Sequence, residues 1–230
     1  RAFIVLKDIN LDFSVGQLII QFVKKDFNSL LKSTSKVFFE DFCELSDIQV
    51  LDEWVISHEI ARIFMIITDY VQTGNKDDFT IIDDIFNKLL LVAVDSNLIS
   101  FWLIIRLLRI ILSTYFKASL WSVLPPLLSS QYTTKNYIQL LSGFVPPVTE
   151  LWPSQVAAIP LAVGENDGGI INLRTSGGKT RVAEIAIINT LSSNSMSKVL
   201  YLAPFRSLAF EVEQSLSKVF NPLGITVSQL

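Results

Sequence analysis

Residues 173–180 read LRTSGGKT, and this stretch decides how the C-terminal part of the chain is expected to fold. A short apolar run precedes it at 170–173, and an apolar pattern of helical period follows it at 179–191. The two glycines let the chain turn tightly, so that successive backbone N–H groups converge on one anion. The following helix directs its positive N-terminal end at the same anion. The stretch therefore predicts a phosphate-binding loop between a strand and a helix.

The side chains at the end of this loop suit a nucleoside triphosphate. Lys179 can reach the β- and γ-phosphates, and the Thr180 hydroxyl can be a ligand of Mg²⁺. We therefore expect Lys179 and Thr180 to be catalytic residues, with ATP and Mg²⁺ as cofactors. Leu173 departs from the G-x-x-x-x-G-K-[ST] pattern, because it occupies the first glycine position. The predicted phosphate-binding residues are Thr175, Ser176, Gly177, Gly178, Lys179 and Thr180.

The remainder of the C-terminal part alternates between strand-like and helical patterns. Residues 198–203 read as a second strand, 207–220 as a second helix, and 225–227 as the start of a third strand. Strands and helices in this alternating order imply a parallel sheet. Ligands of such sheets bind at the C-terminal ends of the strands, where the glycine-rich loop lies.

The N-terminal part has helical periodicity from about residue 17 to residue 141. We expect six or seven helices there, and we expect Asn97 to cap the helix that follows it. The expected breaks fall at 33–35, 73–75, 96–97, 125–126 and 146–147. The predicted fold class is α + α/β, with an all-helical accessory domain at 1–145. The start of a parallel α/β domain of the P-loop NTPase type, incomplete in this chain, is expected at 146–230.

Composition narrows the function classes. The formal net charge is −3, so the chain lacks the strongly basic field with which some proteins attract nucleic acid. A single cysteine and a single histidine exclude a disulfide framework and multi-histidine catalysis within this chain. The most apolar run, 98–112, contains Arg106 and Arg109 and is too short for a membrane span. We expect a cytoplasmic protein without a membrane segment, and a chain that is a fragment because it begins without Met.

Two further motifs flank the loop. Residues 151–159 read LWPSQVAAI, and residues 201–209 read YLAPFRSLA. Together with GGKT, in this order and at this spacing, they resemble superfamily 2 helicases of the DEAD/DEAH type, and within them the superkiller-like branch. Gln155 precedes Lys179 by 24 residues and Pro204 follows Thr180 by 24, as one strand–helix–strand unit requires. The resemblance covers about 80 of the 230 residues.

The resemblance implies roles for the matching positions. Gln155 would bind the adenine edge, with Leu151 or Trp152 packed near the base. A further set would lie against the backbone of a DNA or RNA single strand, and the N–H groups at the start of a helix suit such a phosphate contact. The members of this set are Pro204, Arg206, Ser207 and Leu208. Two alternatives stay open, since Gln155 fits a helix-surface residue and Arg206 fits an ion pair with Glu211.

The resemblance also implies a function for the complete protein. We expect the N-terminal part of an ATP-dependent nucleic-acid helicase or translocase. Helicases of this type need an acidic Asp-Glu-x-His or Asp-Glu-x-Asp box and a second RecA-like domain. Neither occurs in residues 1–230, so we expect this piece alone to be inactive.

The helical part resembles, by its position, accessory domains of large bacterial helicases, including some of anti-phage defence systems. It would dock a protein partner or brace the motor. Two other functions stay open. One is a P-loop ATPase or kinase outside the helicases, and the other is a partner-binding helical module with a vestigial nucleotide site, which the Leu173 departure allows.

Overall fold

The computed structural model describes residues 13–39, 48–77, 79–164, 168–174, 177–194 and 196–229. The chain divides into two compact units, Arg1–Thr114 and Tyr115–Leu230. Each unit is described by itself. In the described parts of both, the regular secondary structure is helical.

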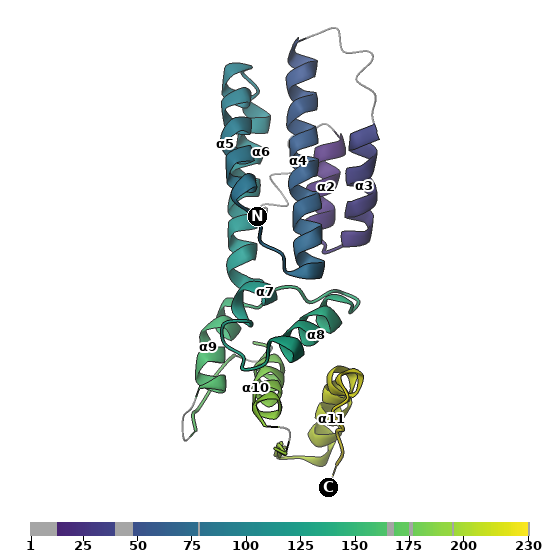
Figure 1. Ribbon diagram of the computed structural model, residues 1–230, viewed down its shortest axis with the longest axis vertical. Coiled ribbons are helices and arrows are strands. Elements are labelled where there is room, and N and C mark those ends of the chain that lie inside the picture. The colour runs from purple at the N-terminus through teal and green to yellow at the C-terminus, as the bar shows by residue number, and fades with distance from the viewer. Residues whose placement is uncertain are drawn as a thin grey trace. The chain divides into compact units, whose positions relative to one another are not determined.

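The first unit is a set of helices packed around one long central helix. Its helices are α2 (Phe13–Val23), α3 (Phe27–Phe39), α4 (Ile48–Thr73), α5 (Phe79–Asp95) and α6 (Ile99–Ala118), whose last residues belong to the second unit. Helix α4 contacts α2, α3 and α5, and the ribbon shows these helices side by side (Figure 1). Ile56, Ile60, Ile63 and Ile67 of α4 are fully buried. Their spacing of three and four residues places them on one face of the helix, which explains why this helix forms the core.

Two helices of the first unit end in the same kind of turn. Lys25 and Asn97 have positive φ angles of 60° and 56°. After α5, the Asn97 amide donates to the Val94 carbonyl and the Leu98 amide to the Ala93 carbonyl, which is a Schellman motif. The prediction that Asn97 caps the start of the following helix is therefore wrong. Asn97 instead ends α5, because asparagine tolerates the left-handed conformation that this turn requires.

The predicted break at Ser33-Thr34-Ser35 is also wrong, since α3 continues through these residues. The hydroxyls of Thr34 and Ser35 donate to the Leu31 carbonyl oxygen at 2.8 and 2.9 Å. The Ser33 hydroxyl accepts a hydrogen bond from the Gln21 side chain of α2. Hydroxyl groups that bond back to the preceding turn let serine and threonine remain within a helix.

Helix α6 is the one helix in the described part of the chain that is long and apolar enough to cross a membrane, by length and composition only. Phe101, Ile104 and Leu108 bury one face of it within the first unit. Arg106 lies over the Trp102 ring at 4.7 Å, and Arg109 bonds to Asp83 and Asn87 of α5. The helix thus has one buried face and two arginines near its middle, where charges are costly in a membrane span.

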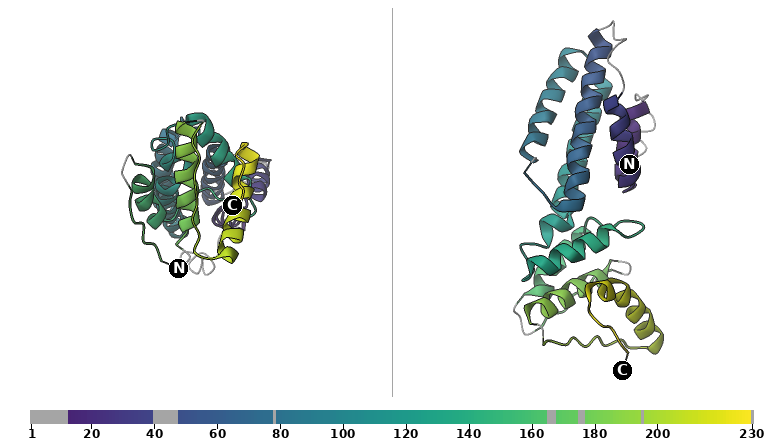
Figure 2. Two further views of the ribbon diagram at one scale, coloured as in Figure 1. Left: turned by 90° about the horizontal axis from the view of Figure 1, so that it is seen from below. Right: turned by 45° about the vertical axis from the view of Figure 1, so that its right-hand side comes forward.

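The second unit contains shorter helices that cross one another. They are α7 (Leu120–Val123), α8 (Gln131–Ser142), α9 (Pro153–Val163), α10 (Lys179–Ser193), α11 (Arg206–Phe220) and the 3-10 helix η2 (Asn221–Leu223). Helix α9 packs on α10, and α8 contacts α11 and η2, as the second view of the ribbon also shows (Figure 2). The core contains Leu120, Tyr137, Leu141, Leu151, Ile159, Ile185, Ile188 and Phe220.

The segments predicted as strands are extended but unpaired. Within the described residues, 170–173, 198–203 and 225–227 form neither helix nor strand. The one β-type pairing in the described part is an isolated bridge between Ser119 and Glu150, where the chain enters α7 and approaches α9. A strand exists only when a neighbour supplies hydrogen bonds to its N–H and C=O groups. The parallel sheet is therefore not confirmed, while the expected helices at 179–191 and 207–220 are.

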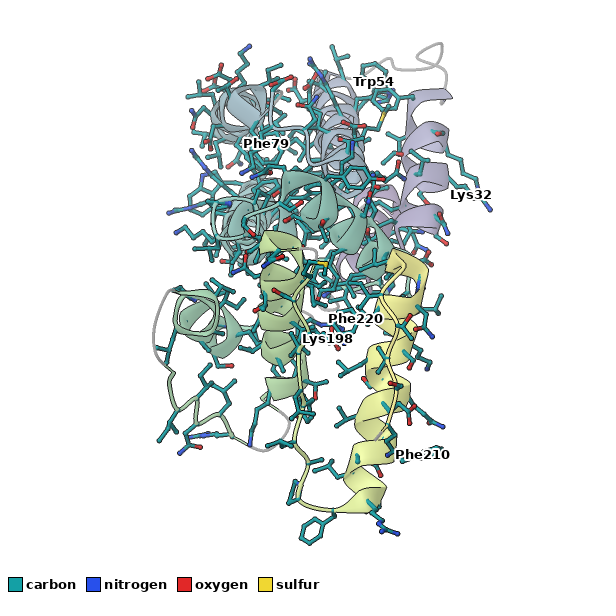
Figure 3. The ribbon with its side chains drawn as sticks, turned by 60° about the horizontal axis from the view of Figure 1, so that its bottom comes forward. Lys32, Trp54, Phe79, Lys198, Phe210 and Phe220 are labelled. Atoms are coloured by element: carbon teal, nitrogen blue, oxygen red, sulfur yellow. The ribbon has the colours of Figure 1, made fainter. Side chains whose placement is uncertain are left out.

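These unpaired segments expose apolar side chains. Ile170 is 93% exposed, Leu200 67% and Leu202 81%. The segment that contains Lys198 is drawn as a thread, whereas Phe220 lies at the end of a regular α11 (Figure 3). Apolar residues of this kind normally pack on the two faces of a parallel sheet.

Candidate nucleotide site at the start of α10

The end of the glycine-rich loop forms the turn into α10. Gly178 is the N-cap residue of α10, with φ 74° and ψ 34° in the left-handed region. A Cβ atom at Gly177 would lie 2.8 Å from the Arg174 carbonyl oxygen and 3.2 Å from Leu173 Cβ. Both positions therefore require glycine, one for its backbone conformation and one for lack of space. The other two predicted loop residues, Thr175 and Ser176, lie outside the described residues.

Lys179 and Thr180 occupy the first turn of α10, and both are exposed. The first turn contains no acidic residue. The Gly178 carbonyl accepts hydrogen bonds from the amides of Arg181 and Val182, which leaves the earlier amides of the helix without an intrahelical partner. Free amides, the positive end of the helix and the lysine together fit a phosphate group. The described end of the loop, Gly177–Thr180, thus fits a phosphate group.

Gln155 joins the start of α9 to this loop. Its side chain is buried, with 7% of the residue exposed. The Oε1 atom accepts a hydrogen bond of 2.8 Å from the Trp152 amide, and the Nε2 atom donates one of 3.1 Å to the Gly178 carbonyl. The first bond satisfies an amide at the start of α9, as in a capping box. Gln155 is therefore not a helix-surface residue. The Oε1 atom can still accept one more hydrogen bond, and the Nε2 atom can still donate one more.

The structure distinguishes the two residues expected near the base. Leu151 is 2% exposed and belongs to the core of the second unit, whereas Trp152 is 54% exposed. Only Trp152 thus has a ring face that a planar base can stack on. A separate hollow of about 340 Å³ lies at the other end of α9 and is lined by Gly168, Gly169, Lys179 and Ala186 among others. It does not include Gln155 or Trp152, so it is not the predicted base site.

A buried polar cluster lies one turn along α10. The Arg181 guanidinium forms an ion pair with Glu184 and donates a hydrogen bond of 3.3 Å to the Tyr137 hydroxyl. The Tyr137 hydroxyl donates to Glu184 Oε2 at 3.2 Å. Burial raises the pKa of the Glu184 carboxyl, although Arg181 and the hydrogen bond from Tyr137 act in the opposite direction. Burial and the negative charge of Glu184 raise the pKa of Tyr137.

Sequence reasoning missed this cluster. The available signal was an Arg and a Glu three residues apart, a spacing that places them on one face of the helix. Tyr137, which lies 44 residues before Arg181, carries no such signal in the sequence.

The residues expected to contact nucleic acid lie at the start of α11. Phe205 is the N-cap residue and has no side-chain cap hydrogen bond. Pro204, Arg206 and Ser207 are exposed, and Leu208 is 37% exposed. In the described part of the chain Arg206 makes no ion pair, so the alternative pairing with Glu211 does not occur there. Among the described residues, no hydrogen bond joins this set to Gly177–Thr180.

The residues that the structure describes offer few ligands for magnesium. No group of three or more His, Cys, Asp or Glu side chains that suits a metal ion occurs among the residues described. The Thr180 hydroxyl is the one predicted ligand, and Mg²⁺ in nucleotide sites takes its other oxygens from phosphates, water and one or two carboxylates. The geometry therefore fits the phosphate part of Mg·ATP and one oxygen ligand of the metal.

Known proteins match this chain over different lengths. Over its whole length the chain is 32% identical to the Hachiman protein HamB of Bacillus cereus, of which it covers 20%. Over 81 residues, 35% of this chain and 11% of the relative, it is 35% identical to the ATP-dependent DNA helicase Hel308 of Pyrococcus horikoshii. Over 97 residues, 36% of this chain and 5% of the relative, it is 32% identical to the RQC trigger complex helicase SLH1 of Saccharomyces cerevisiae.

The chain thus spans one fifth of HamB and smaller shares of the two helicases. Residues 152–230 match the DEAD/DEAH box helicase family. The matched range begins at Trp152 and includes the Gln155 motif, the phosphate loop and the Pro204 motif. Residues 152–230 are therefore similar to DEAD/DEAH box helicases, and the predicted resemblance to superfamily 2 helicases is confirmed.

Proposed function

We propose that this chain is the N-terminal part of an ATP-dependent helicase or translocase and that its residues 173–180 bind the phosphates of Mg·ATP. The hydrogen bond from Gln155 to Gly178 carries the proposal, because it joins two helicase motifs 23 residues apart in one structure. Lys179 would neutralise the β- and γ-phosphates, and Thr180 would be a ligand of Mg²⁺. When bound, Mg·ATP supplies the phosphoanhydride bond whose hydrolysis drives movement.

The same proposal assigns a role to each part of the chain. Residues 1–145 form a helical accessory domain that braces the motor or docks a protein partner, and 146–230 form the first part of a RecA-like domain. The family match from residue 152 supports the motor part of this division, and the packing of α2–α5 within residues 1–114 supports the accessory part. The exposed apolar runs at 170–173 and 198–203 support a sheet whose other strands come from elsewhere in the complete protein.

The partner of the motor is a single strand of DNA or RNA. The exposed N-terminus of α11, where Arg206 forms no ion pair with any residue that the structure describes, supports a backbone phosphate contact there. Similarity to HamB over the whole chain supports a place in an anti-phage defence system. We place the protein in the cytoplasm, where ATP and nucleic acid are both present.

The substitution Lys179→Ala in the intact protein tests the function. We expect it to lower the rate of nucleic-acid-stimulated ATP hydrolysis at least about 100-fold, because the lysine neutralises negative charge that develops in the transition state. Lys198→Ala removes another exposed lysine of the same unit and should leave hydrolysis unchanged. Residues 1–230 alone should show no turnover. Full turnover by Lys179→Ala would refute the assignment, and absence of ATP binding by the wild-type protein would indicate a vestigial site.

A further inference from the structure

The first turn of α10 contains an arginine that the proposed reaction does not use. Arg181 follows Thr180 directly and lies at the positive end of the helix. A cation is unfavourable at that end, because it adds to the partial positive charge of the free amides. A guanidinium at this position, if it were mobile, would also compete with Lys179 for the phosphates. The structure instead holds Arg181 in a buried network.

The network connects two helices. Arg181 and Glu184 come from α10, and Tyr137 comes from α8, which lies earlier in the chain. Each polar group bonds to both of the others, since Arg181 donates to Glu184 and Tyr137, and Tyr137 donates to Glu184. Tyr137 is fully buried and Glu184 is 3% exposed. The Arg181 side chain is 19% exposed, but its guanidinium bonds to two buried groups that also bond to each other, so few other arrangements are open to it.

We propose that Tyr137 and Glu184 are positioning residues for the phosphate loop. They hold the Arg181 side chain against α8 and so fix the first turn of α10, which carries Lys179 and Thr180. The inference rests on the proposed binding of ATP at that turn. It adds α8 to the nucleotide site, although no residue of α8 belongs to the three helicase motifs of this chain.

Tyr137→Phe in the intact protein tests the proposal, because it removes one hydroxyl and keeps the ring in the core. Tyr132→Phe is a matched control on the same helix, since Tyr132 is 78% exposed. With nucleic acid at saturation, we expect Tyr137→Phe to raise the KM for Mg·ATP about fivefold, the size of one or two lost hydrogen bonds. The kcat should stay within about twofold, because a loosened phosphate grip weakens ground-state and transition-state binding alike.

A second variant makes the test independent of the first. Glu184→Gln keeps the size of the side chain and removes its charge, and it should also raise the KM. The double variant should show a smaller rise than the product of the two single rises, because both act through Arg181. Thermal unfolding shows whether each variant is folded. If Tyr137→Phe does not fold, Glu184→Gln decides alone.

The outcomes separate this inference from the proposed function. A KM for Tyr137→Phe equal to that of Tyr132→Phe, or multiplicative rises in the double variant, would overturn the positioning role. If Lys179→Ala keeps full ATP turnover, the proposed function itself fails. Loss of turnover in Lys179→Ala together with an unchanged KM in Tyr137→Phe and Glu184→Gln leaves the function standing and refutes only the inference.

Discussion

The side-chain amide of Gln155 donates a hydrogen bond across 3.1 Å to the carbonyl oxygen of Gly178. A Cβ atom added at Gly178 would lie 2.0 Å from the nitrogen of that amide. The two positions thus restrict each other. A glutamine can occupy this place only while its neighbour has no side chain.

Gly178→Ala should therefore cost more than backbone strain. The left-handed φ of 74° costs a non-glycine residue about 1–2 kcal/mol, and the new methyl group must also displace Gln155. We expect a loss of stability beyond that amount and at least about a tenfold loss of ATP affinity. Isothermal titration and urea unfolding measure the two effects.

Gly224→Ala is the matched control for this substitution. Gly224 has φ 77°, and no atom lies within 4 Å of a Cβ added there. Gly224→Ala should therefore lose only the stability that the backbone strain costs. Equal stability losses in the two variants would mean that Gln155 moves aside without cost.

Gln155→Glu tests the polarity of the same contact. A carboxylate still accepts from the Trp152 amide but cannot donate to the Gly178 carbonyl, so two oxygens would face each other. We expect a stability loss of about 1–3 kcal/mol and weaker binding of ATP. Gln214→Glu adds the same charge at an exposed position of α11 and should be close to neutral. A Gln155→Glu protein that binds ATP as the wild type does would contradict the linking role of this side chain.

Two carboxylates that pair with arginine should differ strongly in their effect on stability. Glu184→Ala leaves Arg181 partly buried without its counter-charge, which typically costs about 3–5 kcal/mol. Asp83→Ala removes an ion pair whose Asp83 and Arg109 side chains are 70% and 40% exposed, and it should cost within about 0.5 kcal/mol. Urea unfolding of each variant measures the difference. Similar losses would show that burial does not decide the strength of these pairs.

Asp26 should make the stability of α3 depend on pH. Hydrogen bonds from the Ser29 hydroxyl and from its amide lower the pKa of the Asp26 carboxyl below 3.8. A lowered pKa in the folded state means that the stabilising contribution is present above about pH 3.8 and is lost as the pH falls through the folded-state pKa. Asp26→Asn retains an N-cap side chain that does not titrate.

The difference in stability between wild type and Asp26→Asn should therefore be constant near neutral pH and shift toward the variant below about pH 3.8. Circular dichroism during acid titration gives this comparison. Ser29→Ala removes the hydroxyl donor and should reduce the shift. A difference that does not vary with pH would refute the role of the carboxylate.

Local features of the nucleotide site were predictable from sequence because they depend on neighbouring residues. The start of α10 at Lys179 was predicted correctly, and α11 begins one residue earlier than expected. A glycine pair followed by an apolar period of 3.6 specifies such a boundary directly. The long-range bonds could not be predicted in this way. The partners Gln155–Gly178 and Tyr137–Glu184 meet through helix packing, which no spacing in the sequence reports.

The expected sheet is a feature that the sequence pattern predicts and the structure does not confirm. The apolar patterns at 170–173 and 198–203 give strand propensity, but a strand also needs hydrogen-bonding neighbours. Among the described residues no such neighbour exists. The serine-rich stretch 33–35 failed for a different reason, since side-chain bonds to the Leu31 carbonyl compensate for poor helix propensity.

The exposed run 199–203, VLYLA, has a consequence for how cells make this protein. An exposed, short, uncharged segment of this type can pair with copies of itself on neighbouring chains. Lys198 and Pro204 bracket the run, and a charge or a proline at such a border opposes this pairing. On the proposed RecA-like fold, the yield of soluble protein should depend on how fast this run is covered relative to encounters between unfinished chains. Slower synthesis at low temperature, or a chaperone that shields this run, should increase the yield of soluble protein.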